Sequence, residues 1–203
     1  MPRYRTRSWR AFEPPAAGVA DAAPPPANLR ILGLDPGSQR TGFGLIDCRG
    51  AEYIHVAHGC IATAAGASLR DRLRTIFEGV RALIEEHQPG EVAIERVFVN
   101  RNADSALKLG QARGAALCAV PAGVGVFEYA PREIKLAVVG FGAAEKLQVA
   151  HMVRALLGLQ GRIGADASDA LAVAVCHAHS RRLRYLAGAR AFAAAGFPGT
   201  AGR

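Results

Sequence analysis

Two short apolar runs that each end in an acidic residue constrain the fold of this chain most strongly. The run ILGLD (31–35) ends at Asp35, before a Pro-Gly turn, and the run EVAIE (91–95) ends at Glu95. Short apolar runs bounded by turn residues are typical of buried strands. An ionised carboxylate in such a setting is costly without a partner. Because ligands of α/β sheets bind at the carboxyl ends of the strands, both acids are candidates for a functional site.

The rest of the chain alternates predicted strands and helices. GFGLIDC (42–48) and EYIHVAHGCIAT (52–63) follow the first run closely, which predicts an antiparallel meander. Apolar residues recur at three and four residues behind Ser68 and stop before Pro89, which predicts an amphipathic helix with a serine cap. The remaining predictions are helices at 103–118, 144–157 and 169–185 and a strand at 124–129. The chain is therefore expected to form an α/β domain.

Charge divides the chain into three parts. Its 203 residues include 25 Lys and Arg against 17 Asp and Glu, a formal net charge of +8, yet residues 31–179 contain 15 of each sign. We expect residues 1–30 to be a disordered Pro/Ala/Arg-rich extension, 31–186 the folded domain and 187–203 a flexible tail. No apolar run approaches the roughly 18 residues of a membrane helix, and the first thirty residues lack a signal peptide's apolar stretch. These features predict a cytoplasmic protein.

A second pair of acids, Asp166 and Asp169, stands three residues apart at a predicted helix start, which places both on one helix face. Each acid has a purely structural explanation: Asp35 as a turn residue, Glu95 in an ion pair with Arg96 or Arg101, and the helical pair as caps. As a set, four converging carboxylates would repel one another unless cations neutralise them. Two magnesium ions held by carboxylates suit phosphodiester hydrolysis, because they activate water and stabilise the departing oxygen.

Aromatic and basic residues follow the second acid. Phe98 is either core filling or a side chain that stacks on an unpaired base. The basic residues of this half of the domain are either a solvated face or phosphate contacts, and a nearby metal centre for phosphodiesters favours phosphate contacts. The candidates are Arg101, Lys108, Arg113, Lys135 and Lys146. His177 and His179 are expected to be satisfied or exposed rather than metal ligands.

Four stretches resemble the RuvC family of crossover-junction endonucleases. They are ILGLDPGSQRTGFGLID, VAIERVFVNRNADSALKLGQARG, AEKLQVAHMV and ADASDALAVAVCH, and the resemblance runs from about Ile31 to about His179. It implies an RNase H-like fold, with a five-stranded mixed sheet flanked by helices, that works as a homodimer. It also implies resolution of Holliday junctions by paired nicks in strands of like polarity, and the RuvA and RuvB proteins as partners.

The resemblance assigns roles by motif. Asp35, Glu95, Asp166 and Asp169 match the family's magnesium-binding acids, with two ions expected per site and manganese as a substitute. Phe98 matches the aromatic that stacks at the opened junction, so Phe98→Ala should impair cutting more than DNA affinity. Lys135 and Lys146 match residues that contact DNA. Two alternatives remain: a YqgF-like nuclease of the RNase H superfamily that acts on RNA, and a non-catalytic junction-binding module.

Overall fold

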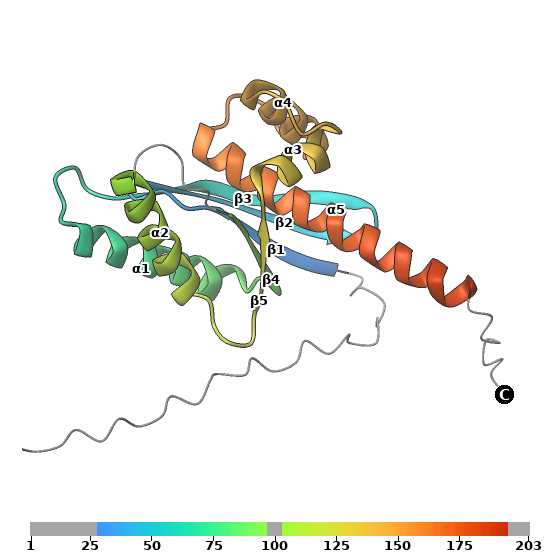
Figure 1. Cartoon of the computed structure of the whole chain (residues 1–203), viewed down its shortest axis with the longest axis horizontal. Coiled ribbons are helices and arrows are strands. Elements are labelled where there is room, and N and C mark those ends of the chain that lie inside the picture. The colour runs from blue at the N-terminus through green and yellow to red at the C-terminus, as the bar shows by residue number, and fades with distance from the viewer. Residues whose placement is uncertain (1–27, 97–102, 195–203) are drawn as a thin grey trace, which may run out of the picture.

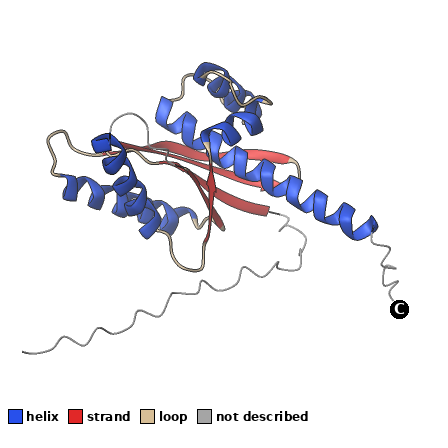
Figure 2. Cartoon of the chain, in the orientation of Figure 1, coloured by secondary structure: helices blue, strands red, loops and turns tan. Residues whose placement is uncertain are grey.

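The computed structural model describes residues 28–96 and 103–194, with side chains described up to residue 186. Its centre is a five-stranded sheet with helices on both faces (Figure 1 and Figure 2). The strands are β1 (Asn28–Asp35), β2 (Arg40–Arg49), β3 (Glu52–Ala62), β4 (Glu91–Glu95) and β5 (Gly125–Tyr129). Their order is β3-β2-β1-β4-β5, and β1 pairs antiparallel with β2 and parallel with β4. The expected mixed sheet and the antiparallel meander are confirmed.

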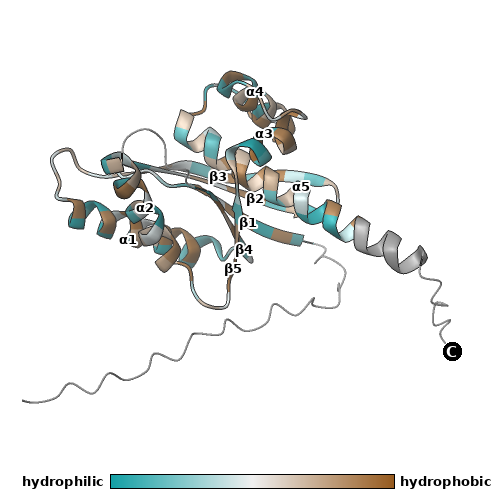
Figure 3. Ribbon diagram, in the orientation of Figure 1, coloured by the Kyte–Doolittle hydropathy of each residue, from teal (hydrophilic) through white to brown (hydrophobic). Residues whose placement is uncertain are grey.

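Helices cover the two faces of the sheet unequally. One face carries α1 (Leu69–His87) and α2 (Ala103–Cys118), and the other carries α3 (Pro131–Val139), α4 (Lys146–Leu156) and α5 (Ala165–Ala194). The predicted serine cap is present, since the Oγ of Ser68 accepts a hydrogen bond from the backbone N–H of Asp71 at 3.2 Å. Along α1, apolar and polar residues alternate as expected of a helix with one buried side (Figure 3). No described helix is long and apolar enough to span a membrane.

The two-residue period of the strands separates two cores. Leu32 and Leu34 of β1 pack in the cluster beneath α1 and α2, whereas Ile31 packs in the cluster beneath α5. Successive side chains of a strand point to opposite faces, so Asp35 falls on the same face as Ile31. On β4 the same alternation places Ala93 in the α5 cluster. Glu95 follows Ala93 by two residues and therefore lies on the same face. Both acids at the strand ends therefore face α5.

The structure adds one helix and moves several predicted boundaries. Helix α3 was missed because nine residues are too few to show a clear period. Its start is marked by Pro131 in the first turn and by the Glu133 carboxylate, which accepts a hydrogen bond from the Ala130 N–H at 2.6 Å. Helix α5 spans 165–194 rather than 169–185, since its alanine-rich ends favour helix without any apolar stripe. Residues 187–194, expected to belong to a flexible tail, are thus helical, and β1 begins at Asn28, inside the expected extension.

Candidate functional site

Helix α5 begins directly on the ends of β1 and β2, and two glycines make this approach possible. A Cβ at Gly42 would collide with the carbonyl oxygen of Asp166, and a Cβ at Gly33 with the carbonyl oxygen of Ala170. Both obstacles are backbone atoms, which cannot swing aside as the end of a flexible side chain can. Glycine at these two strand positions therefore brings the first turns of α5, with Asp166 and Asp169, to the sheet edge where β1 ends.

Asp35 and Glu95 lie side by side at the ends of neighbouring strands. Leu34 pairs with Ile94 in the parallel β1–β4 register, so the two acids are the next residues of their strands. Both side chains are half-buried, and a side-chain hydrogen bond links the two carboxyl groups. Burial, and after it the Asp169 charge, raises the pKa of Asp35. Burial, and after it the Asp35 charge, raises the pKa of Glu95. One proton shared between two carboxyls is the expected response to their repulsion.

The two helical acids each face a cation. The Asp169 carboxylate lies 3.1 Å from the Nζ of Lys146, and this contact raises the pKa of Lys146. The Asp166 carboxylate lies 2.6 Å from the Nε of Arg40. Asp35 interacts electrostatically with both helical acids. The structure thus gathers all four predicted acids around the carboxyl end of β1, with Asp35 at the centre of the group.

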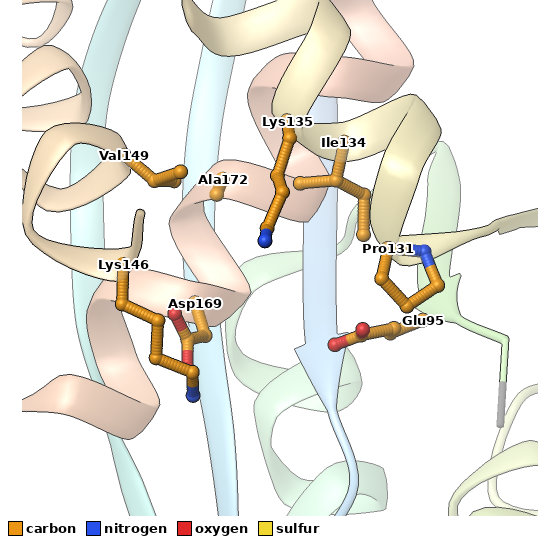
Figure 4. Close-up of a pocket in the computed structure, with 8 residues that line it drawn as sticks. All are labelled: Glu95, Pro131, Ile134, Lys135, Lys146, Val149, Asp169 and Ala172. Atoms are coloured by element: carbon orange, nitrogen blue, oxygen red, sulfur yellow. The ribbon is translucent and has the colours of Figure 1, made fainter. Parts of the chain in front are cut away.

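A pocket of about 200 Å³ opens beside these acids. Its polar lining consists of Glu95, Asp169, Lys135 and Lys146 (Figure 4). The side chain of Lys135 points into the pocket, and no ion pair holds it among the residues that the structure describes. Lys146 is 82% exposed and neutralises Asp169 from the pocket mouth. Two of the predicted DNA-contacting lysines therefore stand next to the acids.

The other predicted basic residues lie elsewhere. Lys108 and Arg113 are on α2, across the sheet from α5; Lys108 pairs with Asp104 at 2.6 Å, and Arg113, only 20% exposed, pairs with Glu128 of β5. Neither lines the pocket beside the acids. Phe98 and Arg101 lie outside the described residues. The alternative partner of Glu95, Arg96, instead lies 3.7 Å from the carboxylate of Glu133.

The donor set of the four acids fits a hard divalent cation, because carboxylate oxygens are the ligands that magnesium prefers. Within the described part of the chain, no three Asp, Glu, His or Cys side chains are arranged as a ready ligand set. In the structure Asp166 pairs with Arg40, and Asp169 pairs with Lys146. Both basic side chains are mostly exposed and can move. A metal ion that bound the acids would therefore take the place of two protein cations, and the total charge of the site would change little.

His177 lies away from the four acids, in agreement with the expectation of a satisfied core histidine rather than a metal ligand. It is fully buried on α5, where Nδ1 lies 2.7 Å from the hydroxyl of Tyr129 and Nε2 lies 2.6 Å from the carboxylate of Glu91. Arg181 also contacts Glu91, at 3.1 Å. Glu91 stands at the opposite end of β4 from Glu95. The imidazole is a satisfied core residue that ties α5 to the sheet.

The comparisons with known proteins decide the family. A family model described as "Crossover junction endodeoxyribonuclease RuvC" matches residues 31–177. The chain belongs to the RuvC family. Similar relatives of that name come from Methylococcus capsulatus, at 56% identity over 75% of this chain and 92% of the relative, and from Shewanella amazonensis, at 52% identity over 79% and 93%.

A solved RuvC structure agrees with this fold. "T. thermophilus RuvC in complex with Holliday junction substrate" is similar with a TM-score of 0.73 and 34% identity, covering 77% of this chain and 97% of that one. The RNase H-like fold predicted from the RuvC resemblance is confirmed, and the four acids lie within the matched residues.

One residue of the site, Arg40, was missed by the sequence analysis. It follows Asp35 by five residues, and nothing in its spacing links it to Asp166, more than a hundred residues later. The antiparallel turn from β1 into β2 brings Arg40 to the same sheet edge as the start of α5. The position of a basic residue shortly after Asp35 was the only sequence signal for Arg40, and it does not indicate that Asp166 is the partner.

Proposed function

We propose that this protein is a metal-dependent endonuclease that resolves Holliday junctions by paired, symmetric nicks in strands of like polarity, during homologous recombination and DNA repair. The observation that carries the proposal is the Asp35–Glu95 pair, which faces the acids of α5 in a chain of the RuvC family. Deoxyribonuclease activity at crossover junctions is what the names of its relatives state. A RuvC structure with 34% identity is titled as a complex with a Holliday junction.

Asp35, Glu95, Asp166 and Asp169 are the residues proposed to hold two magnesium ions, with manganese as a substitute. When bound, the ions supply an activated water and stabilisation of the departing oxygen. Any proton that the Asp35–Glu95 pair holds would have to leave for a metal ion to bind, since carboxylate ligands bind metal in the deprotonated form. With metal bound, Lys146 and Arg40 would release Asp169 and Asp166 and would be free to face phosphate oxygens. Lys135, already directed into the pocket, neutralises charge on the bound strand.

Metal removal tests the proposed function directly. Treatment with EDTA is expected to abolish cleavage of a synthetic four-way DNA junction, and added magnesium should restore it, with a linear duplex of the same sequence as the control substrate. Mapping both cut strands on a denaturing gel should show symmetric nicks. Junction binding without cleavage in magnesium or manganese would favour the non-catalytic module instead. Cleavage of RNA in place of junction DNA would favour the YqgF-like alternative.

The assembly is also a proposal. Paired cuts in two strands require two active centres, which favours the homodimer that the RuvC family resemblance implies. Light scattering should then report twice the 21.3 kDa chain mass. We further propose the cytoplasm as the location and the RuvA and RuvB proteins as partners, which pull-down with the purified proteins on a four-way junction would test.

Replacing Lys135 should weaken DNA binding rather than chemistry alone. Lys135→Ala is expected to lower junction affinity roughly tenfold and to reduce the slope of log affinity against log salt by about 1, because one phosphate contact is lost. Arg81→Ala is the control, since Arg81 pairs with Glu85 on the exposed side of α1. Filter binding across a salt series in EDTA measures both. Equal slopes for the two variants would exclude Lys135 as a phosphate contact.

A further inference from the structure

A second pocket, of about 360 Å³, lies where β2 begins and β3 ends. It is lined by residues 62–66, from the last residue of β3 onward, by Gln39 and Arg40 where β2 begins, and by Arg72 in the first turns of α1. Among the described residues that line it, the two arginines are the charged ones, and none is acidic. A pocket with this lining favours an anion.

The wall of this Arg40–Arg72 pocket is held in place by hydrogen bonds. The backbone N–H of Thr63 and its hydroxyl both donate to the carbonyl of Gln39, at 2.9 and 3.1 Å. The Nε of Arg72 donates to the carbonyl of Ala67 at 3.0 Å, which fixes the guanidinium. No acid of the described chain pairs with Arg72. Its remaining N–H groups are therefore directed by the fold and carry an unneutralised charge.

Arg40 links the pocket to the acids. It lines the pocket and, at 2.6 Å, contacts Asp166 of the proposed metal site. With a side chain that is 59% exposed, it is free to turn from one to the other. A metal ion at Asp166 would neutralise that carboxylate, and Arg40 would then need a new anion. With Lys135 and Lys146 lining the first pocket and Arg40 and Arg72 lining the second, the acid group has basic residues in both neighbouring pockets.

We propose that the Arg40–Arg72 pocket binds a backbone phosphate of the cleaved DNA strand, next to the phosphate that is cut, and that Arg40 exchanges Asp166 for this phosphate. Guanidinium groups match phosphate oxygens with two parallel hydrogen bonds, which suits a fixed Arg72 and a mobile Arg40. The inference rests on the proposed nuclease function. It adds that Arg40 is a positioning residue, which neutralises an acid in the free protein and the substrate in the complex.

The test compares Arg40→Gln and Arg72→Gln with Arg81→Gln, a matched removal of charge on the exposed side of α1. Glutamine at position 72 keeps an amide donor for the Ala67 carbonyl, and Arg72→Lys keeps the charge. Junction binding is measured across a salt series in calcium rather than magnesium, so that a metal ion neutralises the acids while cutting is suppressed, and a denaturing gel confirms that the junction stays intact. Each pocket variant should lose roughly tenfold in affinity and about 1 in salt slope, whereas Arg81→Gln should change neither. Arg72→Lys should recover the slope.

A scan with single neutral methylphosphonates locates the phosphate. One position beside the cut should weaken binding of the wild-type protein in calcium and have no further effect on binding by Arg72→Gln. The pocket proposal would be overturned if the pocket variants melted like the wild type and had the same salt slope as Arg81→Gln. The proposed nuclease function would still stand if the wild type cut junctions. Stabilisation by inorganic phosphate with unchanged DNA slopes would make it a free-anion site and overturn it too. A wild type that neither binds nor cuts junctions would overturn both proposals.

Discussion

Asp35→Asn is expected to slow cleavage of a four-way junction by at least about 1000-fold in magnesium, the largest effect of any single polar change in this chain. Asp35 is the acid that interacts with each of the other three, through a hydrogen bond with Glu95 and electrostatically with Asp166 and Asp169. Asparagine keeps the shape but removes the charge that metal binding needs. Single-turnover cleavage with enzyme in excess measures the chemical step.

Two further measurements separate lost chemistry from lost folding. Junction affinity in EDTA should be retained, and the melting temperature in metal-free buffer should rise by a few degrees, because a buried like charge is gone and the amide can donate to Glu95. Asp71→Asn, at an exposed carboxylate of α1, is the matched control and should cut at the wild-type rate. If Asp35→Asn cut junctions as fast as this control, the four-acid centre would be wrong.

The second large effect concerns packing. Gly33→Ala and Gly42→Ala are each expected to destabilise the protein by about 3 kcal/mol and to lower the melting temperature by roughly 10 °C, because the new methyl group meets the α5 backbone. Relief would require α5 to move away from the sheet, and its first-turn acids would move with it. Cleavage should therefore fall even at temperatures where the variant is still folded. Calorimetry and a cleavage assay at low temperature measure the two losses separately.

Gly110→Ala is the control for this prediction. Gly110 lies within α2 and no atom stands near the place where its Cβ would be. Alanine favours helix over glycine by up to about 1 kcal/mol, so the control should melt at or above the wild-type temperature. Wild-type melting of Gly33→Ala would contradict the close contact between β1 and α5.

The sequence could predict those parts of the site that depend on residues close together in the chain. The apolar runs before Asp35 and Glu95 predicted two buried strands and the position of an acid at the end of each, and the structure places these ends side by side. Asp166 and Asp169 were predicted on one helix face because a three-residue spacing fixes that relation. The four acids come together around β1 because α5 packs closely on the sheet. The RuvC resemblance, rather than the residue pattern, predicted this packing.

What the sequence could not predict depends on long-range geometry. The pairing of Arg40 with Asp166 joins residues separated by most of the domain, and no periodicity encodes it. Arg113 was predicted as a phosphate contact from its charge, yet its ion pair with Glu128 ties α2 to β5. Side-chain charge alone does not say whether a basic residue faces a ligand or another element. Helix α3 was missed for the opposite reason, because its signal was local but short.

The late position of α5 in the chain has a consequence for protein synthesis. This helix supplies two of the four acids and also covers the central strands, with Leu171 and Val173 in the core beneath it. A polypeptide that stops before residue 165, through premature termination or proteolysis, would lose half of the acids and the helix that packs on β1 and β2. We expect such fragments to have no nuclease activity. The four acids can therefore come together only after α5 has been translated and has docked on the sheet.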